Sequence, residues 1–140
     1  MALRGRPKVL LIGNDDAKSS ALEGILGDYT DLSIARNLED GLKILAGGPN
    51  DAIFLGWSCH NTTWTKCMEA ARRLDHGVPV LVFCHDGGRP ERDLVRGAGV
   101  FDLLSAPYWE RTVLSALERA ITSRKGDALV RRRVGARQQF

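Results

Sequence analysis

Apolar residues along this chain fall into five short continuous runs separated by longer segments of mixed polarity. The runs predict strands, which are expected at residues 8–13, 32–35, 51–55, 80–84 and 100–104. Between them, apolar residues recur every three or four positions, as on one face of a helix. Leu38, Leu42 and Leu45 have this spacing and predict one buried stripe. Asn37 is expected to cap the beginning of that helix and Gly47 to mark its end.

Strands and helices alternate along the chain up to about residue 123. Further helices are expected at residues 17–26, 64–74, 90–97 and 109–123. Five successive strand–helix units are typical of a parallel sheet with right-handed crossovers and helices on both faces. Strands that are apolar at consecutive positions fit a sheet that is covered on both faces. The sequence therefore predicts an α/β fold, a three-layer, doubly wound sandwich of five βα units.

The length and the charge distribution divide the chain into a domain and a tail. The 140 residues suit one domain, expected at residues 1–123, followed by a tail at residues 124–140. The tail carries six basic residues and one aspartate, a net charge of +5, whereas the whole chain carries +3, so the remainder is slightly acidic. The basic character is thus confined to the tail.

This basic tail admits three interpretations. It could contact nucleic acid, it could lead into an output domain, or it could extend the last helix into a dimer contact. The run at residues 131–133 has no interleaved aromatic residues, so any nucleic-acid affinity is expected to be weak and strongly salt-dependent. Of the three, a linker is the preferred interpretation.

The sequence carries no sign of export or membrane insertion. Its N-terminal segment lacks the apolar stretch of a secretory signal, and no apolar run approaches the roughly 20 residues of a spanning helix. The three cysteines, Cys59, Cys67 and Cys84, cannot all pair within one chain and are expected to be free thiols. The expected compartment is the cytoplasm.

Ligands of open α/β sheets bind beyond the carboxyl ends of the strands. Most residues that follow the expected strands carry no catalytic group, so the chain is not expected to be an enzyme. Two adjacent Cys-His pairs could supply a zinc site, namely Cys59, His60, Cys84 and His85. Such pairs lack the spacing of structural zinc sites, and consecutive strand side chains point to opposite faces. Neither a metal nor another cofactor is therefore expected.

Four segments resemble the framework of bacterial response-regulator receiver domains. They are residues 8–12 (KVLLI), 51–55 (DAIFL), 78–83 (VPVLVF) and 97–107 (GAGVFDLLSAP). The most specific is the Gly-Ala-Gly-x-x-Asp run followed by a proline. The resemblance covers about residues 7–123 and implies a flavodoxin-like receiver fold with a five-stranded parallel sheet in the order 2-1-3-4-5.

Receiver domains take a phosphoryl group onto an aspartate after the third strand. A Mg²⁺ ion bound by that aspartate and an acidic pair assists, as do a hydroxyl residue and a lysine. The resemblance places the acceptor on Gly56 and the acidic pair on Gly13 and Asn14. It places the hydroxyl residue on Cys84 and the lysine on Ala106. None of these residues has the family's side chain, so the chain resembles a pseudo-receiver. The family's switch aromatic corresponds to Leu103, which is not aromatic either.

In an alternative interpretation the chain is still phosphorylated, with the help of an acidic residue that stands a little further along the sequence than in the family. Asp15 and Asp16 lie one or two residues beyond the expected acidic pair and could turn inward, although both are also suited to cap the following helix. Ser58 could be modified only by a different phosphoryl donor. Gly56 itself has no side chain to modify, so we expect function without phosphorylation.

The remaining expectation concerns a partner surface. In receiver domains, the face formed by helix four, strand five and the last helix is a common dimer or output surface. Here that face would include Arg92, Arg96, Trp109, Arg111 and Arg119. We therefore expect contact with a protein partner or a second copy, as in the N-terminal regulatory domain of a bacterial transcriptional regulator. A membrane partner is not expected.

Overall fold

A computed structural model describes residues 6–13, 17–56, 63–74, 77–84, 100–105 and 107–123. Five parallel strands form one sheet in the order β2-β1-β3-β4-β5. The strands are β1 (Lys8–Ile12), β2 (Asp31–Ala35), β3 (Ala52–Gly56), β4 (Val80–Cys84) and β5 (Asp102–Ser105). The predicted fold class and strand order are confirmed.

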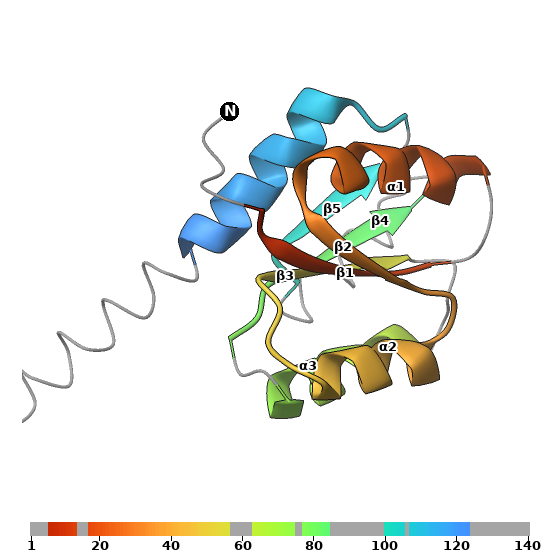
Figure 1. Cartoon of the computed structure of the whole chain (residues 1–140), viewed down its shortest axis with the longest axis vertical. Coiled ribbons are helices and arrows are strands. Elements are labelled where there is room, and N and C mark those ends of the chain that lie inside the picture. Colours follow the sequence, from red (N-terminus) through yellow and green to blue (C-terminus); the bar gives the residue numbers. More distant parts are fainter. Residues whose placement is uncertain are drawn as a thin grey trace, which may run out of the picture.

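Helices cover both faces of this sheet (Figure 1). One face carries α1 (Ala17–Tyr29) and the last helix, which spans residues 110–123. The opposite face carries α2 (Leu38–Ala46) and α3 (Thr63–Leu74). The expected helix at residues 90–97 and the tail at residues 124–140 lie outside the described residues. None of the described helices is long and apolar enough to cross a membrane.

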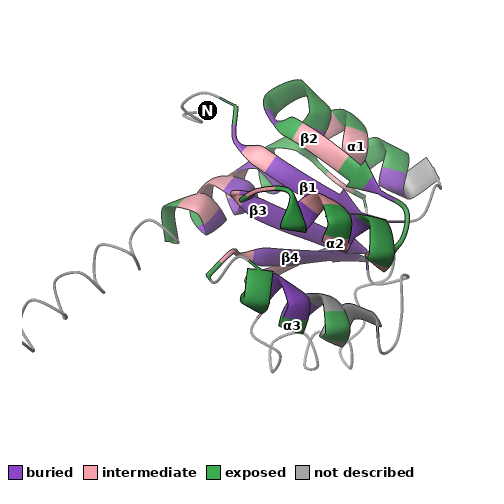
Figure 2. Cartoon of the chain, turned by 60° about the horizontal axis from the view of Figure 1, so that its bottom comes forward, coloured by how far each residue is buried: buried purple, intermediate pink, exposed green. Residues whose placement is uncertain are grey.

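Central strand β3 is buried along its whole length, and its neighbours β1 and β4 are buried from Val9 to Ile12 and from Val80 to Phe83 (Figure 2). The face below α1 and the last helix is lined by Val9, Leu11, Phe54 and Phe83 together with Leu117 of the last helix. On the other face, strand residues pack against α2 and α3; they include Leu10, Ile12, Ile53, Leu55 and Val80. Consecutive apolar residues therefore supply two separate cores, which explains why these strands read as continuous apolar runs.

Helix α2 lies closer to the sheet than its leucine stripe predicts. Asn37 caps it as expected, because its side chain accepts a hydrogen bond from the Asp40 N–H, and Gly47 ends it. Its buried residues are Gly41 and Leu45, whereas Leu42 is only partly buried. The predicted stripe of leucines was therefore wrong in part.

The reason is the spacing between this helix and the sheet. A methyl group placed on Gly41 would lie 2.5 Å from Cδ1 and 2.9 Å from Cγ1 of Ile12. The helix backbone thus approaches β1 at the one position that has no side chain.

Candidate functional site

The carboxyl edge of the sheet brings together three of the residues predicted for a degenerate pocket. Gly13 follows β1, Gly56 ends β3, and Cys84 ends β4. Since β1 pairs with β3 and β3 with β4, the glycines lie on neighbouring strands at the same level. Asn14, Asp15 and Ala106, which complete the predicted set, lie outside the described residues, as does Asp16.

The side chain of Phe83 occupies the space in front of both glycines. A methyl group placed on Gly13 would lie 2.8 Å from Cζ of Phe83, and one placed on Gly56 would lie 3.1 Å from the same atom. The side chain belongs to the hydrophobic core, since Phe83 has only 2% of its surface exposed and is part of the cluster below α1. The ring can approach so closely only because neither neighbour has a Cβ.

A second aromatic ring continues the packing from Phe83 toward the last helix. The rings of Phe83 and Tyr108 meet edge to face, with centroids 6.2 Å apart and planes at 83°. This is a favoured geometry for an aromatic pair. Tyr108 follows Pro107 and is partly buried against the same core. The edge of the sheet is therefore connected by direct packing to the segment that enters the last helix.

This arrangement does not fit the magnesium ion that the receiver resemblance implies. Neither Gly13 nor Gly56 has a side-chain oxygen, and the hydrocarbon ring between them offers no ligand to a hard cation. Among the described residues, no group of three or more His, Cys, Asp or Glu side chains could hold a metal ion. Of the zinc candidates, only Cys84 falls within the described residues; Cys59, His60 and His85 do not.

Three of the five predicted interface residues are described, and all three are exposed. Trp109 has 66% of its surface exposed, and Arg111 is also exposed. Arg119 pairs with Asp102 of β5 at an N–O distance of 3.3 Å. The last helix therefore presents one basic side chain, that of Arg119, beside β5. Arg92 and Arg96 lie outside the described residues.

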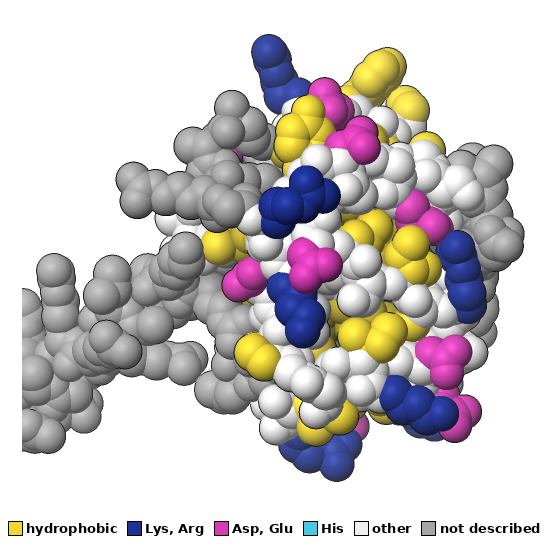
Figure 3. Space-filling view, in the orientation of Figure 1, with side chains coloured by type: hydrophobic (Ala, Val, Ile, Leu, Met, Phe, Trp, Pro, Cys, Tyr) yellow, Lys and Arg dark blue, Asp and Glu magenta, His cyan; other side chains and the backbone are white. Residues whose placement is uncertain are grey.

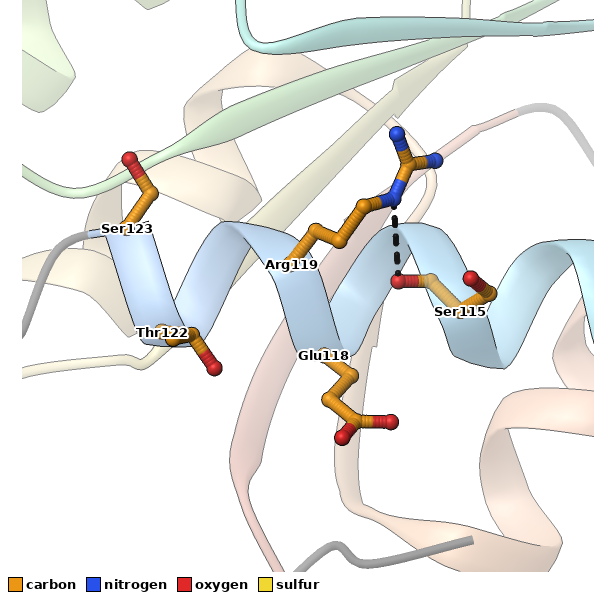
Figure 4. A pocket seen from close by; sticks show the side chains of 5 residues that line it. All are labelled: Ser115, Glu118, Arg119, Thr122 and Ser123. Carbon is orange, nitrogen blue, oxygen red and sulfur yellow. Dashed lines mark hydrogen bonds between the residues drawn. The ribbon is translucent and has the colours of Figure 1, made fainter.

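An open hollow of about 550 Å³ lies along the last helix, lined by Ser115, Glu118, Arg119, Thr122 and Ser123. Figure 4 shows Glu118 and Arg119 pointing to different sides of the helix. The Arg119 Nε–H donates to the carbonyl oxygen of Ser115 at 3.4 Å. This hollow is lined by residues of a single helix and is open to solvent, so it lacks the enclosure of a ligand site.

A contact between α1 and the last helix was not anticipated from the sequence. The hydroxyl of Tyr29, near the end of α1, donates a hydrogen bond to the carboxylate of Glu110. That bond, and the negative charge of the carboxylate, raise the pKa of Tyr29 above its usual value of 10.0. The pair joins the end of α1 to the first turn of the last helix.

Charged side chains on the surface are mixed in sign. Figure 3 shows basic, acidic and hydrophobic side chains interspersed over the described part of one face. A nucleic-acid-binding surface is typically a stripe of basic residues. The described residues of this face do not form such a stripe.

No family model and no curated protein matches this chain. Solved structures do match it. The CheY-like response-regulator receiver domain of Methanospirillum hungatei is 15% identical, with a TM-score of 0.74 over 88% of this chain and 99% of that one. The receiver domain of a putative LuxO repressor from Vibrio parahaemolyticus is 16% identical, with a TM-score of 0.75 over 89% and 97% of the two chains.

The receiver domain of a sensor histidine kinase from Pseudomonas aeruginosa is also 16% identical, with a TM-score of 0.73 over 84% of this chain and 99% of that one. That structure contains a magnesium ion coordinated in the active-site cleft. The chain described above therefore has the fold of response-regulator receiver domains. At the corresponding edge of this chain's sheet, the ring of Phe83 packs against Gly13 and Gly56.

Proposed function

We propose that this chain is a pseudo-receiver, a signalling domain that keeps the receiver fold and acts by protein contact without being phosphorylated. One observation carries the proposal. The Phe83 ring packs against Gly13 and Gly56, the positions that correspond to acidic residues in receiver domains. Neither position carries a carboxylate, and the ring leaves little room for a side chain at either of them.

The competing proposal is a phosphorylatable receiver that uses a shifted acid, Asp15 or Asp16. The two proposals differ in what acetyl phosphate does to the intact protein in the presence of Mg²⁺. A pseudo-receiver gains no mass, because no carboxylate stands at the acceptor position. A shifted acceptor gains one phosphoryl group in an acyl phosphate, which hydroxylamine removes.

Intact-protein mass spectrometry distinguishes these outcomes, with a phosphorylatable receiver domain treated in parallel as the positive control. The matched variant is the double substitution Asp15→Asn and Asp16→Asn. Stoichiometric labelling of the wild-type chain that disappears in this variant would refute the pseudo-receiver proposal and establish the shifted acid. A label that resists hydroxylamine would point to Ser58.

The partner surface proposed for this domain is the face of helix four, strand five and the last helix. The exposure of Trp109 and Arg111 supports it, as does the position of Arg119 beside β5. Aromatic and arginine side chains are the residues most enriched at the energetic centres of interfaces. The partner is a second copy of the chain or another protein, as expected for a regulatory domain of a cytoplasmic transcriptional regulator with residues 124–140 as its linker.

Sedimentation velocity of the 140-residue chain tests the homodimer form of this proposal. Trp109→Ala and Arg96→Glu should each shift the protein toward monomer, and added salt should do the same. Acetyl phosphate should change nothing. Charge reversal at residues 131–133 is the control: if it alone dissociates the protein, the contact lies in the tail. The same tail variant tests the nucleic-acid alternative. In that case the wild-type chain should bind DNA, and charge reversal at residues 131–133 should abolish the binding.

A further inference from the structure

Among the described strands, β2 has a neighbour on one side only, because it stands at the end of the sheet (Figure 2). The Asp31 N–H donates to the carbonyl of Pro7, and the carbonyl of Ala35 accepts from the Gly13 N–H. Residues 31 and 35 therefore direct their backbone groups toward β1. Backbone groups in a strand alternate in direction, so those of Leu32 and Ile34 point away from the sheet.

The same two residues also carry apolar side chains on one face. Leu32 packs against the core below α1, and Ile34, two residues further on, lies on that face with 40% of its surface exposed. Ser33 between them is partly buried. The edge from residue 32 to residue 34 thus contains no charge and no proline, the two devices that usually prevent edge-to-edge pairing.

The other end of the sheet differs in this respect. The Phe101 N–H donates to the carbonyl of Val80, so the backbone groups that point away from β4 are those of Asp102 and Leu104. The Asp102 carboxylate accepts hydrogen bonds from the Leu103 N–H at 2.8 Å and from Arg119 at 3.3 Å. Within the described residues, the β5 edge therefore carries a charged pair, whereas residues 32–34 of the β2 edge carry no charge.

We infer that β2 pairs antiparallel with β2 of a second copy of this chain, which joins two sheets into one. A two-fold axis through Ser33 places Leu32 opposite Ile34 of the second copy, and Ile34 opposite its Leu32. Each such pair exchanges two backbone hydrogen bonds and brings two apolar side chains into contact. The occupant is a second copy because this register satisfies both outward-facing residues of both chains and places no like charges opposite each other.

The interface is small, since it consists of two five-residue strands. Stable dimers bury about 1,200–2,000 Å² in total, so this one should form only as concentration rises. It is also separate from the proposed partner surface on the last helix and β5, because β2 and β5 lie at opposite ends of the sheet. The two surfaces can therefore be tested independently.

Hydrogen exchange measured residue by residue by NMR gives the most specific readout. In dilute protein, the amides of Leu32 and Ile34 should exchange rapidly, whereas those of residues 31, 33 and 35 are protected by β1. At high concentration the amides of Leu32 and Ile34 should become protected as well. If these two amides exchange equally fast at all concentrations, no strand pairing takes place.

A cysteine at position 33 tests the symmetry axis. The two Cα atoms of a non-hydrogen-bonded antiparallel pair lie about 4.5 Å apart, within the range that a disulfide spans. Mild oxidation of the Ser33→Cys chain should therefore give a covalent dimer well in excess of that from the wild-type chain. Ser20→Cys, at an exposed position of α1, is the matched control. Equal dimer yields from the two variants would refute the register.

A charge on the edge supplies the energetic test. Ile34→Lys should raise the dissociation constant measured by sedimentation about tenfold or more, because it removes two symmetric contacts and places a charge opposite Leu32. Leu74→Lys is the matched control, because it makes the same kind of change at an apolar residue that is 49% exposed at the end of α3. The edge inference would be overturned if Ile34→Lys leaves the dimer intact while Trp109→Ala dissociates it. That result would instead support the partner surface on the last helix.

Discussion

Replacing Gly13 by alanine is expected to destabilise the fold by about 1–3 kcal/mol, the usual cost of adding a methyl group to a packed core. The added methyl would lie 2.8 Å from Cζ of Phe83 and 3.4 Å from Cδ2 of Leu11, and the ring has little room to retreat because only 2% of Phe83 is exposed. The cost is steric alone, since the backbone of Gly13 does not adopt a conformation that only glycine favours. Gly56→Ala should cost less, because its methyl would lie 3.1 Å from the same ring atom.

The matched control is Gly24→Ala in the middle of α1. A methyl group there would meet nothing within 4 Å. Because alanine is a better helix former and restricts the unfolded chain, this variant should be more stable than the wild type by about 0.5–1 kcal/mol. The two substitutions make the same chemical change, so the comparison shows whether a methyl group costs stability where it meets packed atoms and not where it meets none.

The assay is urea unfolding followed by circular dichroism, with free energies of unfolding from linear extrapolation. Phe83→Leu shortens the side chain and should relieve the clash. The cost of Gly13→Ala in that background should therefore fall by about 1 kcal/mol or more, a coupling typical of residues in contact. Strict additivity of the two substitutions, or a Gly13→Ala protein as stable as the wild type, would refute the packing argument.

Three further predictions concern other contacts in the structure. Gly41→Ala should destabilise the protein by about 1–3 kcal/mol in the same assay despite its gain in helix propensity, because its methyl would lie 2.5 Å from Cδ1 of Ile12. Asn37→Ala should cost about 1 kcal/mol by loss of the cap on α2, and Asn37→Ser should restore most of it. Because its pKa is raised in the folded protein, Tyr29 contributes stability below pH 10 that is lost as the pH rises through the folded pKa. Absorbance at 295 nm should show Tyr29 ionising above pH 10, and Tyr29→Phe should remove this titration and the stability change that accompanies it.

Much of the fold could be predicted from the sequence because each buried strand is apolar at consecutive positions. β4 was predicted with its exact bounds, and β1, β2 and β3 were displaced by one residue at one or both ends. β5 was placed less well, because Asp102 interrupts the apolar run. Helix α2 shows where this reasoning fails. The spacing of apolar side chains shows which face of a helix is buried. It cannot show that the helix lies closest to the sheet at a glycine, which has no side chain.

For the site, the sequence could predict only which receiver side chains are replaced by residues without their functional groups. The resemblance placed Gly13 and Gly56 at the vacant positions, but it did not indicate what fills the space between them. Phe83 lies in a run that already reads as a buried strand, so nothing in its sequence context distinguishes it from its neighbours. Its role depends on the register that sets Phe83 beside Gly56, and register is a property of the assembled sheet. The contact between Tyr29 and Glu110 was missed for the same reason, because it joins helices far apart in sequence.

The packing of Phe83 against two glycines also has a consequence for how this domain can evolve. A single base change converts the glycine codons GGU and GGC into aspartate codons, so a carboxylate at position 56 is one mutation away. That mutation alone would place a carboxylate beside an aromatic ring in a filled core, next to a position 13 that also has no carboxylate. Under the proposed function, phosphorylation at position 56 would therefore need a further substitution at position 83 to make room for the carboxylate.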